Sequence, residues 1–436
     1  MKITDFDKPE RKIRVVQFGG GVFLRGFFDW MLQKTNNLGL TDADAVIIRS
    51  HTRGPDPLAA QSFRYTHLAR GSEGVDLTRI DSIAGSINPA DDPTALYSLA
   101  VSPDLAVAVS NTTESGIRYD PCPAPTETVV PDSYPARLAV LLYRRFRAGL
   151  PGLLILPCEL IAENGPILRS IVERHARDWG YEDEFLSYLS GSCSFRETLV
   201  DRIVSGAPSG QVILPYEDAL VNTSEYFHLF VISGEEDPRI PFRAAGLNVR
   251  FVPDVTPYRT LKVRILNGAH TSMIPYALCE RVETVGECLK TPAVESHLKG
   301  CLSEIIDSLD VDRKEAEQYA DAVLLRFANP FLHHLCSSIA LNSIDKFRVR
   351  VLPSILGYEK RIGSPPPHLL FALGQLFRFY KTGEPRDDAN LIARIKGEPI
   401  AAILADPGLW GEDLSRFAPT VERYAEATRF EVSYGE

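Results

Sequence analysis

Short apolar runs alternate with longer amphipathic stretches over more than half of the chain. An uninterrupted apolar run is typical of a strand that is covered on both faces, whereas apolar positions with a helical period predict an amphipathic helix. The runs occupy residues 14–18, 45–48, 105–110 and 153–156, and helices are predicted at residues 134–147 and 167–179. Strands that alternate with helices in this way predict an α/β domain with a parallel, doubly wound sheet.

The character of the chain changes near residue 253. Before that point one turn of helix is expected at Asp201, and beyond it nearly every segment has a helical pattern. A hairpin is predicted at residues 63–68 and 76–82, and two late strands at residues 226–232 and 249–252. We therefore predict an α/β domain over residues 1–253 and a mainly α-helical domain over residues 254–436.

Three polar side chains stand in an otherwise apolar helical stretch at residues 258–274. With about 100° per residue, Lys262, His270 and Asn267 fall at about 0°, 80° and 140° around the helix axis. An ammonium, an imidazole and an amide that converge in this way suit the reduction of a carbonyl group. The alternative is structural, with Lys262 reaching water while Asn267 and His270 cap a bend at Gly268.

A glycine-rich turn follows the first predicted strand, where a βα turn can bring backbone N–H groups close to a pyrophosphate. The spacing is not G-x-G-x-x-G, because Leu24 takes the place of the third glycine and Gly26 comes later. A tight structural turn would explain the glycines about as well. The candidate cofactor contacts in this segment are Gly19, Gly20, Gly21, Val22, Phe23 and Arg25, whose guanidinium could pair with a phosphate.

Polar residues also follow the other predicted strands, at the edge of the sheet where such folds bind cofactors. The second strand ends at Arg49 and offers no acid for a ribose, so the residues leave the choice between NAD and NADP open. A cluster of helix caps and turns is the structural alternative for the rest. The candidates are Arg49, Asn111, Thr112, Thr113, Glu114, Cys158, Glu159 and Asn164.

Composition and charge narrow the class of protein. The 436 residues, 44% hydrophobic and 24% charged, are typical of an ordinary globular protein with two or three domains. A formal charge of -10 argues against nucleic acid as a partner, because a phosphate backbone selects basic surfaces. An anionic substrate would need a local basic pocket.

Cysteine and histidine usage predicts neither a disulfide framework nor a metal site. The 7 cysteines are an odd set without C-x-x-C spacing, and no H-E-x-x-H motif is present. The N-terminal segment is polar and charged, and no run approaches the roughly 20 apolar residues of a membrane span. We therefore expect a metal-free cytoplasmic protein that is not bound to a membrane.

The chain resembles the polyol-specific long-chain dehydrogenases, the mannitol dehydrogenase family. Lys262, Asn267 and His270 reproduce the K-x4-N-x2-H signature of that family. The likeness extends in family order through FGGGVFLRGFFDW, SNTTESGI, LPCELIAENG, TLVDRIVSG, ILNGAHT and SIALNSIDKFRVRVLPSI, from about residue 15 to residue 355. Within the family, SNTTESGI, LPCEL and ILNGAHT most resemble the tagaturonate reductases, also called altronate oxidoreductases.

The resemblance implies a zinc-independent enzyme with a Rossmann-type N-terminal domain, a helical C-terminal domain and an active site in the cleft between them. It also implies NAD(H) as the cofactor. The signature lysine is then the general acid/base, the asparagine supports the oxyanion, and the histidine orients substrate hydroxyls. Burial would lower the pKa of Lys262 from its ordinary value of about 10.4.

Three further positions carry expectations about the substrate. Arg259 stands where mannitol dehydrogenases have a glutamate, and its guanidinium could hold a carboxylate unless it is merely exposed. Glu197 stands where polyol members have an oxyanion-binding asparagine, and a carboxylate donates no hydrogen bond unless it is protonated. Glu197 then either points elsewhere, shares a proton with Lys262 or marks a changed reaction. Lys346 aligns with a substrate-contacting lysine, or forms a salt bridge with Asp345.

The leading hypothesis is an NAD-dependent reductase that converts D-tagaturonate, a small-molecule sugar acid, to D-altronate. We expect it to act as a monomer or a small homo-oligomer. The alternatives are a relative acting on fructuronate and mannonate or on a neutral polyol, and, because of Glu197, a sugar-acid isomerase or epimerase that retains NAD.

Overall fold

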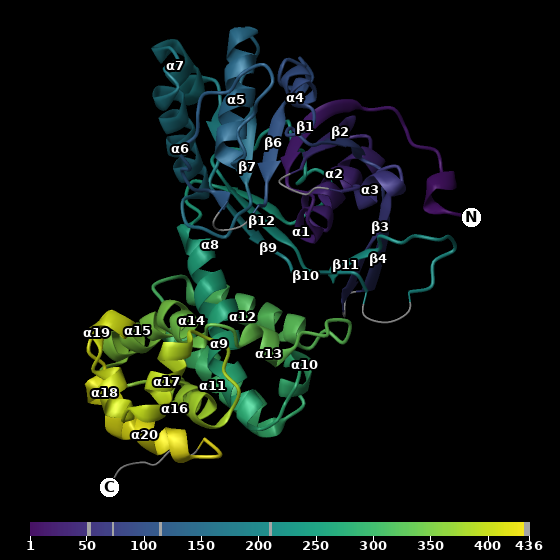
Figure 1. Cartoon of the computed structure of the whole chain (residues 1–436). Coiled ribbons are helices and arrows are strands. Elements are labelled where there is room, and N and C mark those ends of the chain that lie inside the picture. The colour runs from purple at the N-terminus through teal and green to yellow at the C-terminus, as the bar shows by residue number, and fades with distance from the viewer. Residues whose placement is uncertain (50–53, 72–73, 113–115, 209–211, 431–436) are drawn as a thin grey trace. The chain divides into compact units, whose positions relative to one another are not determined.

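The structure is a computed structural model that describes residues 1–49, 54–71, 74–112, 116–208 and 212–430. The chain divides into two compact units, Met1–Val255 and Thr256–Glu436 (Figure 1). Each unit has hydrophobic clusters of its own. No helix in the described part of the chain is long and apolar enough to cross a membrane.

The first unit is built on a six-stranded sheet in the order β5-β2-β1-β6-β7-β8. Every neighbouring pair in it is parallel. The strands are β1 (Lys12–Phe18), β2 (Ala43–Ile48), β5 (Ile83–Ile87), β6 (Val107–Ser110), β7 (Leu154–Pro157) and β8 (Ser194–Phe195). The chain builds outward from β1 on one side and from β6 on the other, so the β1–β6 junction is the switch point at which such sheets bind ligands.

Helices cover both faces of this sheet, as the sequence predicts (Figure 1). Alternate residues of one strand explain why: Val15 faces the cluster that contains α2, whereas Val16 faces the cluster that contains α4 to α7. The helices of this unit are α1 (Val22–Arg25), α2 (Phe28–Asn37), α3 (Pro57–Ala60), α4 (Pro93–Ala100), α5 (Tyr134–Arg147), α6 (Asn164–Asp178) and α7 (Asp183–Gly191). This arrangement confirms the predicted Rossmann-type α/β fold.

Two smaller sheets complete the first unit, and the sequence predicts them only in part. One has the order β10-β11-β3-β4, with β3 (Tyr65–Gly71) and β4 (Gly74–Ile80) forming the predicted hairpin. The other has the order β13-β12-β9. Its strand β9 (Thr198–Asp201) corrects the expected helical turn at Asp201, because these residues pair with β12. The remaining strands are β10 (Val204–Gly206), β11 (Asn222–Glu225), β12 (Leu229–Ser233) and β13 (Val249–Val252).

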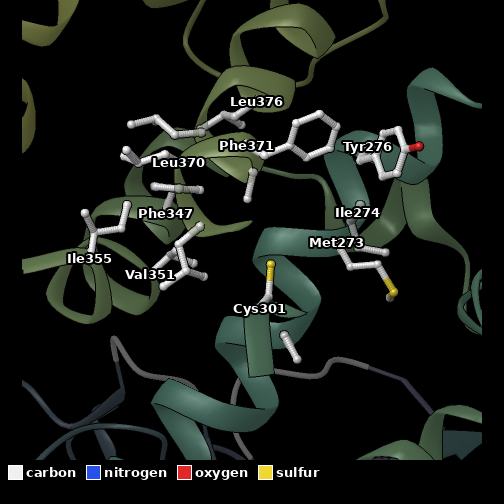
Figure 2. Packing of buried hydrophobic residues seen from close by; sticks show 14 of the residues in the cluster. Met273, Ile274, Tyr276, Cys301, Phe347, Val351, Ile355, Leu370, Phe371 and Leu376 are labelled. Carbon is white, nitrogen blue, oxygen red and sulfur yellow. The ribbon is translucent and has the colours of Figure 1, made fainter. Parts of the chain in front are cut away.

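The second unit is mainly α-helical, as predicted, and α9 (Gly268–Cys279) lies at its centre. Figure 2 shows Met273, Ile274 and Tyr276 of α9 among apolar side chains from α11, α14, α15 and α16. The other helices are α8 (Thr256–Leu261), α10 (Val285–Cys288), α11 (Pro292–Ser308), α12 (Arg313–Phe327), α13 (Cys336–Ile339), α14 (Ser343–Arg350), α15 (Leu352–Ile362), α16 (Pro367–Thr382), α17 (Ala389–Gly397), α18 (Ile400–Leu404), α19 (Pro407–Trp410) and α20 (Ala418–Glu426).

Candidate active site

The glycine-rich turn leaves β1 at the switch point of the sheet. Gly19 has a φ of 109°, and a Cβ atom added there would lie 2.9 Å from the carbonyl oxygen of Asn111. A Cβ at Gly20 would lie 3.3 Å from the Ile47 side chain. Gly21 differs, because it precedes α1 and a Cβ at this position meets no described atom within 4 Å. Packing therefore requires glycine at position 19, whereas Gly21 borders open space.

Helix α1 carries the remaining candidates of this turn. Val22 is exposed, Phe23 stacks on Phe27, and Arg25 is half-buried with its guanidinium 5.6 Å from the centre of the Tyr65 ring. Gly26 explains the departure from the usual glycine spacing. A Cβ there would lie 2.8 Å from Val204 Cγ1, so this glycine allows the end of α1 to pack on β10 of the second sheet.

A buried polar group beneath the glycine turn was not among the predicted residues. Gln17 Nε2 donates to the Gly19 carbonyl oxygen over 3.0 Å, which fixes the turn from below. The Tyr65 hydroxyl lies 2.8 Å from the Arg25 carbonyl oxygen and 3.2 Å from Asp29 Oδ2. Burial raises the pKa of Asp29 to about 7. The signal in the sequence was a single glutamine within the apolar run of β1 and a single aspartate within the apolar start of α2.

The candidates at the ends of β6 and β7 form one hydrogen-bonded group. Asn111 Nδ2 donates to the Cys158 carbonyl oxygen over 2.8 Å. The buried Glu159 carboxylate accepts from the Thr112 backbone N–H at 2.9 Å and from the Ser110 hydroxyl at 2.9 Å, while burial raises the pKa of Glu159. The structure therefore brings these residues beside the glycine turn. Thr113 and Glu114 lie outside the described residues.

Asn164 and Arg49 support the same edge of the sheet through their contacts with the protein. Asn164 is fully buried; its Nδ2 donates to the Pro157 carbonyl oxygen over 3.0 Å, and its Oδ1 accepts from the Thr198 N–H over 2.9 Å. It thus joins α6, β7 and β9. Arg49 Nη2 donates to the Gly54 carbonyl oxygen over 3.0 Å. Direct contact of either residue with a cofactor stays a prediction.

Glu197 lies just before β9, where its carboxylate is held by backbone. Oε1 accepts the N–H of Glu163, the residue that precedes α6, over 3.1 Å. The Glu197 N–H donates in turn to the Ser233 hydroxyl over 2.9 Å. The side chain is thus an acceptor fixed at the start of α6.

The segment that carries Lys262 and Asn267 corrects the prediction of a regular α-helix. Residues Lys262–Asn267 form a turn of π-helix between α8 and α9, with hydrogen bonds of the i→i+5 type. Residues five apart then stand about one turn apart, so Lys262 and Asn267 share one side of the helix and are not separated by about 140°. Turns of this type occur frequently at functional sites.

His270 is the third residue of α9, in its first turn, and it is buried. Its ring stacks on Phe327 with 4.2 Å between ring centres and meets the edge of His334 at 5.3 Å. The Thr271 hydroxyl donates to the Asn267 carbonyl oxygen over 2.8 Å. Aromatic packing therefore fixes the imidazole orientation.

Two further cations predicted to bind substrate lie in the same unit. Arg259 is half-buried in the last turn of α8. Lys346 Nζ donates to the Ile339 carbonyl oxygen over 2.9 Å, and burial lowers the pKa of Lys346. Asp345 pairs with Arg348, and among the described residues the alternative salt bridge between Lys346 and Asp345 is not formed. Within the described part of the chain, no group of three His, Cys, Asp or Glu side chains could hold a metal ion.

Comparisons with known proteins identify the family of the chain. The model of the mannitol dehydrogenase Rossmann domain matches residues 13–241, and the model of the mannitol dehydrogenase C-terminal domain matches residues 254–429. The chain is 37% identical to altronate oxidoreductase of Klebsiella pneumoniae, over 96% of this chain and 94% of the relative. It is 36% identical to altronate oxidoreductase of Halalkalibacterium halodurans, over 97% and 91%.

Two solved structures share the fold over nearly the whole chain. D-sorbitol dehydrogenase in substrate-free form matches with a TM-score of 0.79 at 19% identity, covering 96% of this chain and 95% of that one. Mannitol 2-dehydrogenase of Pseudomonas fluorescens matches with a TM-score of 0.72 at 19% identity, covering 96% and 91%. The predicted resemblance is thus confirmed: the chain belongs to the mannitol dehydrogenase family, and it is an oxidoreductase of the polyol or sugar-acid class.

Proposed function

We propose that the protein is a zinc-independent, NAD(H)-dependent oxidoreductase that interconverts D-tagaturonate and D-altronate. The observation that carries the proposal is the near-full-length similarity to altronate oxidoreductases, which includes the K-x4-N-x2-H residues. Relatives that act on neutral polyols share the fold at lower identity.

The glycine turn fits a dinucleotide. Gly21 borders open space in which a Cβ would meet no described atom, so the backbone of Gly21 and Val22 can approach a pyrophosphate closely. In the proposal Arg25, on the same short helix, pairs with phosphate oxygens, and Asn111 and Thr112 lie at the adjacent strand end. When bound, the nicotinamide supplies hydride for reduction and accepts it for oxidation.

Lys262, Asn267 and His270 supply the chemistry of the protein itself. Negative charge develops on the ketone oxygen during reduction, and Lys262 donates a proton to that oxygen. The Asn267 side-chain N–H stabilises the same charge from the same side of the π turn. His270, held by Phe327 and His334, orients the sugar hydroxyls. In the oxidation of altronate, Lys262 accepts the proton.

Arg259, Lys346 and Glu197 complete the proposed substrate site. Arg259 and Lys346 attract the carboxylate of a sugar acid. Because the chain has a net charge of -10, an anionic substrate needs such a local positive charge at its binding site. Glu197 is a hydrogen-bond acceptor held by Glu163, which suits a sugar hydroxyl better than an oxyanion.

The test is a substrate panel followed through NADH absorbance at fixed protein concentration. Tagaturonate, fructuronate and fructose are supplied separately, and NADPH replaces NADH in a parallel series. We expect tagaturonate with NADH to give the highest kcat/KM. Preferred reduction of fructose would contradict the sugar-acid assignment. Preferred reduction of fructuronate would show that the enzyme interconverts fructuronate and mannonate.

The carboxylate of Glu197 supports one alternative function, that of a sugar-acid isomerase or epimerase that retains NAD. Product chromatography without added cofactor separates the two reactions. Conversion of tagaturonate to another ketouronate, without net consumption of NADH, would replace the reductase assignment.

A further inference from the structure

The π turn carries a second cation besides Lys262. The Arg264 guanidinium, within the turn, donates to the hydroxyls of Ser354 at 2.8 Å and Ser308 at 3.2 Å. Neither partner carries a charge, and burial lowers the pKa of Arg264 to about 10. Arg264 therefore adds positive potential to the turn that holds Lys262.

Arg350 extends this cluster from α14. It is four residues after Lys346, so both side chains leave the same face of the helix. Burial and then the charge of Arg350 lower the pKa of Lys346, whereas the Asp387 carboxylate raises it. The nearest acids are otherwise engaged: Asp345 pairs with Arg348, and Asp387 accepts from the Tyr380 hydroxyl over 2.5 Å.

The Arg350 guanidinium is the second feature of this cluster, and no partner for it lies in the described part of the chain. It is half-buried, and burial lowers the pKa of Arg350. Among the described residues, no carboxylate or other acceptor forms an ion pair or hydrogen bond with this side chain. Guanidinium carries five N–H donors in a planar fork that matches a carboxylate, and removing such donors from water without partners is costly. A half-buried, unpartnered fork is therefore suited to an anionic ligand.

The position of α14 connects Arg350 to the proposed catalytic residues. A Cβ added at Gly268, which directly follows Asn267, would lie 3.4 Å from the Arg350 carbonyl oxygen. The end of α14 thus packs against the junction of the π turn and α9, within the second unit (Figure 1). The backbone that carries Arg350 therefore lies next to the turn that carries Asn267.

We propose that Arg350 and Lys346 together bind the carboxylate of the sugar-acid substrate, Arg350 through two parallel hydrogen bonds and Lys346 as a point charge. The inference rests on the proposed function and deepens it, because it assigns recognition of the acid to α14. Arg259 then contributes general positive potential and makes no direct contact with the carboxylate.

The experiment measures binding of D-altronate to the NADH-saturated protein by titration calorimetry, since this dead-end complex cannot turn over. Arg350→Gln should weaken altronate binding by about ten- to a hundredfold, the range for a lost charge-assisted hydrogen bond. Arg350→Lys keeps the positive charge but loses the planar fork of donors, so its affinity for altronate should lie between those of wild type and Arg350→Gln. Arg361→Gln is the control in the same unit, because Arg361 is exposed and pairs with Asp310.

Steady-state kinetics supply the second readout. In Arg350→Gln the loss of kcat/KM for tagaturonate should come mainly from KM, with kcat changed less than threefold. An altronate affinity within twofold of wild type would overturn the inference, as would a loss confined to Arg259→Gln. Should Arg350→Gln fail to fold, Arg350→Lys and Lys346→Gln decide by the same criteria. Failure of wild type to reduce tagaturonate would refute the proposed function itself.

Discussion

A general acid works only when its proton lies within hydrogen-bond reach of the oxygen that receives it. The π turn brings Lys262 and Asn267 to one side of the helix, and in the proposed mechanism both serve the same oxygen. We expect Lys262→Ala to lower kcat by about 10²-fold or more, the size of a lost general acid. Turnover with tagaturonate and NADH measures this. Lys360→Ala, an exposed lysine in the same unit, is the control, and near-normal turnover of Lys262→Ala would remove it from the mechanism.

Asp29 makes stability depend on pH in a direction that can be worked out. Burial raises its pKa from 3.8 to about 7, so between these values the folded chain keeps a proton that the unfolded chain has lost. Stability then falls as pH rises through this window, by about 1.4 kcal/mol per pH unit. Asn at this position does not titrate, and its amide can donate to Gln17 Oε1, a buried acceptor without a partner among the described residues.

Asp29→Asn should therefore gain stability relative to wild type between pH 4 and pH 7. Urea unfolding of both proteins at pH 5, 6 and 7 measures the difference between their free energies of unfolding. The contributions of all other titrating groups are the same in both proteins and cancel in this difference. Parallel pH profiles would show that the buried carboxyl does not keep its proton.

At the scale of elements, the π turn determines how Lys262 and Asn267 are oriented relative to each other, which the sequence did not predict. The K-x4-N-x2-H spacing identifies the residue types of the proposed site, yet angles derived from a regular helix separate Lys262 from Asn267. The π turn packs against α11, α12 and α14, which are distant in sequence, so a local residue pattern does not specify it. The contacts of Glu197 and Arg350 escaped prediction for a related reason, because Glu163 and Gly268 are distant in sequence.

The glycine turn allows packing to be separated from ligand binding with one pair of variants. Gly19→Ala places a Cβ 2.9 Å from the Asn111 carbonyl oxygen at a φ of 109°, so it should destabilise the fold by about 1–3 kcal/mol. Gly21→Ala meets no described atom, and its φ of -67° is ordinary.

Gly21→Ala should therefore keep its thermal midpoint within a degree or two while the KM for NADH rises about tenfold, because the added methyl occupies space that the pyrophosphate needs. Differential scanning fluorimetry and NADH titration measure the two effects. Equal KM values for Gly21→Ala and wild type would place the dinucleotide away from this turn.

At the scale of the molecule, the sequence predicted the parts that depend on local pattern. Buried strands alternating with amphipathic helices specify the doubly wound sheet, and the change near residue 253 lies beside the division after Val255. The two smaller sheets were missed in part, since β3 pairs with β11 and β9 pairs with β12 across long stretches of chain. Register between remote strands is fixed by burial in three dimensions.

The separate cores of the two units lead to a prediction about the whole chain. Because each unit buries its own apolar clusters, we expect calorimetry to resolve two unfolding transitions in the presence of NAD⁺. A ligand that binds only the folded state stabilises it by about 2.7 kcal/mol at a hundred times its Kd, so NAD⁺ should raise the transition of the first unit selectively. Tryptophan fluorescence of Trp410→Phe, followed during heating, assigns the transitions. In this variant the tryptophans that remain, Trp30 and Trp179, both lie in the first unit, so the fluorescence change reports the unfolding of that unit. One transition that shifts as a whole would show that the two units unfold as a single cooperative body.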